Sequence, residues 1–298
     1  MQISIVDIGK VLTRTSGYLQ TVASHSLQPY RGCPLGHSLC GVSCYVQHSR
    51  HITRGRAWGD FLEARHNAAD SYRRHVDAER RWARRNRKDF AIFLSSATEP
   101  FPPQERRFGI TRSVLEAMVE HPPDRLILQT HSHQIADSVP LLTQLAGVCD
   151  LRCHLSIETD LEQLAGMPRH GSPVERRFQA ARRLRDEGLF TVITVSPLLP
   201  IAEPEAFFAR IANSADAVVL DHFIGGDGSK HGSRTRRTRL PDVMEAVHPG
   251  SSRLEYRDLM ADIAERHLPD RVGISIGGFA GRNASGKPFP PLEEHLVS

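Results

Sequence analysis

Apolar residues after position 88 follow two alternating patterns. Short apolar runs that end in small polar residues are typical of buried strands, whereas apolar residues three and four positions apart are typical of helices. The expected strands cover residues 90–96, 125–130, 151–159, 190–200, 217–223 and 271–278. The expected helices lie between them, over residues 111–121, 139–148, 173–188, 203–214 and 253–268.

This alternation predicts an α/β fold, because strands that alternate with helices form βαβ units with a parallel sheet. Five or six successive units predict a partial TIM-type (β/α)6 barrel over about residues 90–278. No Gly-x-Gly-x-x-Gly follows the first strand, which disfavours a dinucleotide-binding fold. In barrels of this type the functional residues lie at the carboxyl ends of the strands. Here those ends read Ser95–Glu99, Thr130–His133, Ser156–Thr159, Ser196-Pro197 and Asp221-His222.

The composition is that of a soluble globular protein. Of the 298 residues, 40% are hydrophobic and 24% are charged, a balance that allows a sizeable core. No run approaches the roughly 18 apolar residues of a membrane span. The N-terminus has Asp7 within its short apolar run and no basic segment, so we expect no signal peptide and no membrane partner. We expect a cytoplasmic protein whose cysteines are reduced, and one domain over residues 1–298 with a tail at 279–298.

Two basic segments suggest an anionic partner. Residues 50–88, which we expect to form an Arg-rich helical insertion, carry twelve Lys or Arg against five Asp or Glu, whereas the whole chain has a net charge of +4. Such a segment could bind a polyanion through its phosphates, or it could be a solvated helix face. Residues 223–239 are expected to form a long mobile loop that either grips an anionic substrate or is a disordered surface segment.

Three of the five cysteines, Cys33, Cys40 and Cys44, lie within twelve positions. Their neighbours are Pro, Gly, Ser and His, which are typical of a loop at 29–46 rather than of a core. Reduced cysteines disfavour a disulfide and leave a metal site or catalysis as the function of this group. Cys149 and Cys153 are spaced as in a strand, and we expect them to be buried, with a radical-quenching or auxiliary-cluster role as the alternative.

Several short motifs together resemble a known family. They are PYRGC at 29–33, CY at 44–45, TEPFPPQERRFGITR at 98–112, LSIET at 155–159, MPRHGSPVERRFQAARRL at 167–184 and SPLLP at 196–200. In this order, over about residues 10–225, they resemble the radical S-adenosylmethionine (radical SAM) superfamily, in the branch related to spore photoproduct lyase. The resemblance implies a lyase- or oxidoreductase-type enzyme that binds a [4Fe-4S] cluster and S-adenosyl-L-methionine.

The resemblance also implies roles for individual residues. Cys33, Cys40 and Cys44 would bind three irons, and the cofactor would chelate the fourth. An external electron donor such as flavodoxin or ferredoxin would reduce the cluster, and cleavage would yield a 5′-deoxyadenosyl radical that abstracts hydrogen from an unidentified substrate. The substrate could be anionic or a nucleic acid. The candidates for binding the cofactor are Tyr45, Ser96, Thr98, Glu99, Ser156, Glu158 and Arg169.

The sequence departs from the family pattern at several positions. The family spacing is Cys-x3-Cys-x2-Cys, and here it is Cys-x6-Cys-x3-Cys, so that His37 is an alternative middle ligand, with Cys33 and Cys40. His131 replaces an expected Lys. The hydrogen-donating cysteine of spore photoproduct lyase has no counterpart in FLSSATEP at 93–100, so we do not expect thymine-dimer repair by that mechanism.

Two other functions remain open at this stage. A zinc-dependent barrel hydrolase would use the histidines of 130–133 and 221–222 as ligands. A nucleic-acid-binding protein with a structural cluster would use the two basic segments instead. Brown colour would distinguish an iron–sulfur protein from a zinc enzyme, and salt-dependent nucleic-acid binding without cofactor cleavage would indicate the binding protein.

Overall fold

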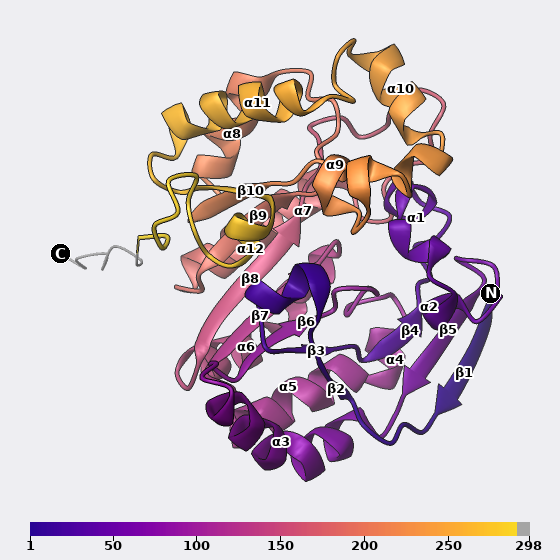
Figure 1. The fold of residues 1–298 in the computed structure, drawn as a ribbon, viewed down its shortest axis with the longest axis vertical. Coiled ribbons are helices and arrows are strands. Elements are labelled where there is room, and N and C mark those ends of the chain that lie inside the picture. Colours follow the sequence, from indigo (N-terminus) through magenta and orange to yellow (C-terminus); the bar gives the residue numbers. More distant parts are fainter. Residues whose placement is uncertain (291–298) are drawn as a thin grey trace.

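The chain is organised around an eight-stranded sheet, described here for residues 1–290 from a computed structural model (Figure 1). The strand order is β11-β10-β9-β8-β7-β6-β3-β2, with β2 antiparallel to β3 and the other neighbours parallel. The strands are β2 Leu12–Arg14, β3 His25–Leu27, β6 Ala91–Leu94, β7 Arg125–Thr130, β8 Asp150–Ser156, β9 Thr191–Val195, β10 Ala217–Leu220 and β11 Val272–Ile274.

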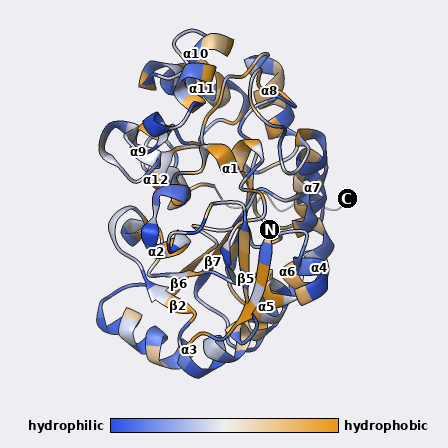
Figure 2. Ribbon diagram, turned by 90° about the vertical axis from the view of Figure 1, so that its right-hand side faces the viewer, coloured by the Kyte–Doolittle hydropathy of each residue, from blue (hydrophilic) through white to orange (hydrophobic). Residues whose placement is uncertain are grey.

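Among the described residues, five helices follow the strands and pack over one face of the sheet: α5 Ile110–Glu120, α6 Val139–Ala146, α7 Val174–Asp186, α8 Pro204–Ala212 and α11 Leu254–His267. In Figure 2, α5, α6, α7 and α8 lie along one side of the molecule. The short helix α4 Glu105–Phe108 precedes α5, and α10 Leu240–Val247 packs in a separate apolar cluster. The structure confirms the predicted α/β fold and its partial TIM-type barrel, with all six expected strands present. The strand expected over 271–278 is shorter, because Ser275 has a φ of +44° and residues Ser275–Phe279 form helix α12.

Both faces of the parallel sheet are buried, as βαβ connections require. On β7, Leu126 and Leu128 pack under the helices, while Ile127 faces a second apolar cluster on the other side. Phe279 and Phe289 belong to that second cluster, so the first part of the predicted 279–298 tail packs on the sheet. Residues 291–298 of the tail lie outside the described residues.

A second, three-stranded sheet was not predicted. It contains β1 Gln2–Val6, β5 Phe61–Arg65 and β4 Tyr30–Gly32, in the order β1-β5-β4. The predicted helical insertion at 50–88 is therefore wrong in part, since β5 lies between α2 Arg50–Thr53 and α3 Ala68–Arg85. Leu62 and Ala64 of β5 join the core, and the alternating positions face the other side of the small sheet.

Two predicted loops also contain short helices. The 29–46 segment includes β4, α1 Leu39–Ser43 and the start of the 3-10 turn Tyr45–His48. The 223–239 segment folds into α9 Phe223–Gly226 and two 3-10 turns, Lys230–Gly232 and Thr235–Arg237. Asp227 supports this fold, because its side chain accepts hydrogen bonds from the backbone amides of Ser229 (2.9 Å) and Thr235 (2.8 Å). No helix among residues 1–290 has the length and apolar character to cross a membrane.

Candidate active site

A cavity of about 600 Å³ lies where the carboxyl ends of the strands meet the cysteine loop. Eight of the residues predicted from the sequence line it: Cys33, Cys40, Cys44, Tyr45, Ser96, Thr98, Glu99 and Ser156. Glu158, Arg169 and His37 are not among its lining residues. His37 is exposed, and its Nε2 lies 2.8 Å from Asp60 Oδ1 on the surface, so the structure brings the three cysteines together without it.

Glycines allow the cysteine loop to fold tightly against the barrel. A Cβ on Gly41 would lie 2.0 Å from the Leu35 carbonyl oxygen, and one on Gly36 would lie 2.2 Å from the Cα of Gly59. Both distances are far below van der Waals contact, so the loop requires glycine at these positions. The backbone amide of Leu39, the first residue of α1, donates to the carbonyl of Arg169 (3.0 Å). The loop is thereby fixed to the segment that follows β8.

All three cysteines line the cavity, and, after burial as the main cause, the charge of Cys44 would raise the pKa of both Cys33 and Cys40. Burial is the main cause that raises the pKa of Cys33 to about 12 and that of Cys44 to about 11, and it also raises the pKa of Cys40. The thiols are therefore protonated in the absence of metal, and iron would displace their protons on binding. Three cysteines on one loop that line the same cavity, with Cys33 buried and Cys40 and Cys44 partly buried, fit a cluster bound through three thiolates.

The cavity also contains buried polar atoms that lack protein partners. Among the described residues, Tyr18 Oη, Ser43 Oγ, Trp58 Nε1, Ser95 Oγ and Gln129 Oε1 have no hydrogen-bond partner, and all of these side chains line the cavity. Buried polar groups in native proteins are nearly always hydrogen-bonded. This set is therefore suited to a polar ligand that supplies the missing partners.

Glu99 lies in the segment that follows β6 and is held in place by three donors. Its carboxylate accepts hydrogen bonds from the backbone amides of Phe101 (2.9 Å) and His131 (2.9 Å) and from the Thr130 hydroxyl. Burial raises the pKa of Glu99, although these donors oppose the shift. Glu99 is thus a fixed hydrogen-bond acceptor in the cavity wall.

Two glutamines that the sequence reasoning missed position the predicted serines and threonine. Gln28 donates to Ser96 Oγ (2.8 Å) and accepts from Thr98 Oγ1 (3.1 Å). Gln129 donates to Ser156 Oγ (2.6 Å). Gln129 could have been found from the sequence, because a polar side chain near the carboxyl end of a barrel strand is a recognisable signal.

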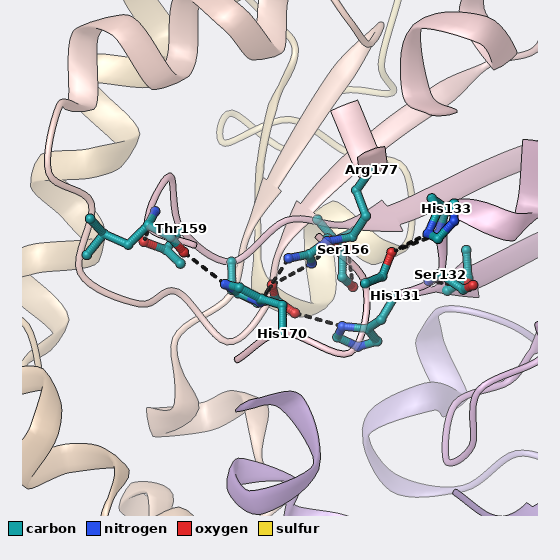
Figure 3. Close-up of polar contacts among 12 residues, drawn as sticks. His131, Ser132, His133, Ser156, Thr159, His170 and Arg177 are labelled. Atoms are coloured by element: carbon teal, nitrogen blue, oxygen red, sulfur yellow. Dashed lines mark hydrogen bonds and ion pairs between the residues drawn. The ribbon is translucent and has the colours of Figure 1, made fainter. Parts of the chain in front are cut away.

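Glu158 belongs to a buried ionic network beside the cavity, and its partners His131 and Arg177 are labelled in Figure 3. Its carboxylate pairs with Arg177 (2.7 Å) and with His131 Nδ1 (2.7 Å). Although burial opposes ionisation, Arg177 and His131 hold the pKa of Glu158 well below its ordinary value. Arg177 is only 1% exposed and also donates to the Ser156 carbonyl (2.6 Å). Glu158 therefore orients His131, which lines the cavity, rather than contacting a ligand itself.

Arg177, and not Arg169, is the buried arginine of this region. Arg169 is exposed and does not line the cavity. The signal for Arg177 is its spacing, since it lies three residues after Val174 and next to Phe178 on the buried face of α7.

Two of the polar residues predicted at the ends of β9 and β10, Ser196 and Asp221, also line the cavity without belonging to the predicted cofactor set. Asp221 is buried, its Oδ2 accepts from Ser196 Oγ (3.1 Å), and its Oδ1 has no hydrogen-bond partner among the described residues. Burial raises the pKa of Asp221 to about 6. Tyr18 lies close enough for the Asp221 charge to raise its pKa further, after burial as the main cause.

The histidines of the zinc alternative contact separate partners. His131 Nδ1 binds Glu158, His133 Nδ1 lies 2.7 Å from Ser172 Oγ, and His222 Nδ1 accepts from the amide of Ile224 (3.1 Å). Within residues 1–290, no group of three His, Cys, Asp or Glu side chains, the three cysteines of the loop included, is arranged to hold a single metal ion. These contacts do not support the zinc alternative. Cys153 is fully buried in the core under the helices, as expected, and Cys149 packs against that core.

Comparison with known proteins identifies solved structures of similar fold. A double mutant of spore photoproduct lyase with bound AdoMet and dinucleoside spore photoproduct has a TM-score of 0.62 and 14% identity, covering 92% of this chain and 81% of that chain. A single mutant with dinucleoside spore photoproduct has a TM-score of 0.61 and 14% identity, covering 92% and 80%. The sequence matches no protein-family model and no curated protein. The chain therefore has the fold of spore photoproduct lyase, which confirms at the level of fold the resemblance seen in the sequence motifs.

Proposed function

We propose that this protein is a radical S-adenosylmethionine enzyme, with a [4Fe-4S] cluster bound by Cys33, Cys40 and Cys44. The observation that carries the proposal is the placement of these three thiols in one cavity, at the carboxyl ends of the strands. The fold of spore photoproduct lyase supports it. When bound, the cluster would supply the electron that cleaves S-adenosyl-L-methionine reductively, so that a hydrogen atom is abstracted from a substrate.

The residues of the chain would bind the cofactor and exclude water. The three cysteines would hold the cluster inside the cavity. Glu99, fixed by its three donors, accepts a hydrogen bond from the cofactor's amine. His131 donates its Nδ1 proton to Glu158, so its Nε2 is left to contact a ligand. Tyr45 and Ser156 complete the lining that we assign to the cofactor.

The substrate would occupy the part of the cavity formed by β9, β10 and α9. Ser196, Asp221 and Arg234 line this part and have no counterpart in the predicted cofactor set. The buried Asp221 oxygen without a partner is suited to a hydrogen-bond donor of the substrate. Because β6 ends without a cysteine, we propose a hydrogen abstraction other than thymine-dimer repair by the cysteine-dependent mechanism.

Electron paramagnetic resonance of the anaerobically reconstituted and reduced protein tests this function. We expect a [4Fe-4S]⁺ signal that changes when S-adenosyl-L-methionine is added, together with 5′-deoxyadenosine detected by chromatography. Cys44→Ala should abolish the signal, whereas Cys149→Ala should retain it, because Cys149 lies outside the cavity. A signal that is unchanged after S-adenosyl-L-methionine is added would instead indicate a structural cluster. The absence of any cluster signal would refute the proposal.

A further inference from the structure

The small sheet and the segment after helix α2 carry four arginines that the proposed function does not use. Arg31 of β4 pairs in register with Glu63 of β5, and Arg65 lies two positions further along the same face of β5. Arg54 and Arg56 follow helix α2, which contacts β4. We call Arg31, Arg54, Arg56 and Arg65 the arginine cluster.

One carboxylate compensates only part of the positive charge of this cluster. Glu63 Oε1 lies 2.5 Å from Arg56 Nη2, and Glu63 Oε2 lies 3.5 Å from Arg31 Nη1. Arg65 Nη1 donates to the Gln28 carbonyl (2.9 Å), but its buried Nε has no hydrogen-bond partner among the described residues. A buried donor without an acceptor is unfavourable. The arginine cluster therefore has both unpaired charge and an unsatisfied donor.

The arginines also repel one another. Burial is the main cause that lowers the pKa of Arg65 to about 10, and the charges of Arg31 and Arg54 lower it further. Burial and Arg54 likewise lower the pKa of Arg31. An anion bound between these side chains would relieve the repulsion. Arg73 of α3 differs from the arginine cluster, because its charge is compensated at the surface by Glu120, which it contacts through two nitrogens.

We propose that the arginine cluster binds a phosphate group of the substrate. The guanidinium group presents several N–H donors in a plane, which match the oxygens of a phosphate. Arg31 has a side chain that is only 15% exposed, so its interaction with an anion is less screened than that of a fully exposed arginine.

None of the four arginines lines the cavity, but hydrogen bonds link the arginine cluster to residues of the cavity wall. Gln28 connects the two, because its carbonyl accepts from Arg65 and its side chain bonds Ser96 and Thr98. Arg31 is also only two residues before Cys33. A molecule whose phosphate binds the cluster could therefore place its remainder in the cavity, a step that rests on the proposed function. The phosphate could belong to a small ester or to a nucleic-acid backbone.

Isothermal titration calorimetry of the reconstituted protein tests the site with inorganic phosphate, a nucleoside monophosphate and a short single-stranded oligonucleotide. We expect Arg31→Gln/Arg65→Gln to weaken binding of the probes about tenfold or more, since hydrogen bonds to charged groups contribute strongly. Arg84→Gln/Arg85→Gln removes the same charge from an exposed part of α3 and should change binding less than about twofold. Arg65→Lys keeps the charge without the planar fork and should give an intermediate loss.

The outcomes separate the alternatives. Tighter binding of the oligonucleotide than of the monophosphate would identify a nucleic-acid backbone, and equal binding would identify a small phosphate ester. Equal losses in both double variants would show general attraction to a basic surface and would overturn the proposal, as would no loss in either. Thermal unfolding of each variant checks that it is folded. Because calorimetry does not require cofactor cleavage, failure of this site and failure of the proposed function are distinguishable.

Discussion

Ionisation of Asp221 should destabilise the folded protein, so Asp221→Asn should stabilise it at neutral pH. Burial raises the pKa of Asp221 from 3.8 to about 6. Each pKa unit corresponds to about 1.4 kcal/mol, so the full difference is about 3 kcal/mol. The folded state binds the Asp221 proton more tightly than the unfolded state does. The stabilisation that protonated Asp221 provides is therefore complete below about pH 4 and is lost as the pH rises through about 6. The asparagine variant has no such loss.

Urea denaturation between about pH 4 and pH 7.5 measures this effect. We expect the free energy of unfolding of Asp221→Asn to exceed that of the unmodified protein by up to about 3 kcal/mol above pH 6. Asp227→Asn is the matched control in the same cavity. Burial acts to raise the pKa of Asp227, but hydrogen bonds from Ser229 and Thr235 lower it overall. Replacing the Asp227 carboxylate should therefore lower the free energy of unfolding at neutral pH. The difference from the unmodified protein should be smaller below about pH 4. The reasoning is refuted if Asp221→Asn has the same pH dependence as the unmodified protein.

Two further predictions concern the surroundings of the cavity. Arg177→Met should lower the free energy of unfolding by about 3–5 kcal/mol, because it leaves the buried Glu158 carboxylate without its arginine partner. The control Arg176→Met, at an exposed position of α7, should change thermal stability little. Equal effects of the two substitutions would contradict the pairing of Arg177 with Glu158. Gly41→Ala should reduce the amount of iron bound after reconstitution, because the added Cβ would clash with the backbone of the cysteine loop. The control Gly9→Ala should bind iron normally, because no non-neighbouring atom lies within 4 Å of the added Cβ. Iron content that is unchanged in Gly41→Ala, with an unchanged circular dichroism spectrum, would argue against a tightly packed cluster loop.

The sequence alone determined the order of the barrel strands and helices. Residues 125–130 and 111–121 show clear periodicities, and the structure places β7 and α5 within one residue of those bounds. These signals are local, because the spacing of apolar residues depends on the side of an element that is buried. The polar residues at strand ends could also be predicted, since parallel strands bring their carboxyl ends to one edge.

Only the tertiary structure decided which residues meet across long separations. Strand β5 lies within an Arg-rich segment, and its pairing with β1 joins residues 59 positions apart, as in Gln2 with Phe61. No local pattern encodes such a pairing. The spacing of Arg177 places it on the buried face of α7, but burial of a charged side chain also depends on its partner. The sequence could not indicate that this partner is Glu158. Three-residue strands such as β3 are too short for a periodic signal, and their position depends on the neighbouring strands that complete their hydrogen bonds.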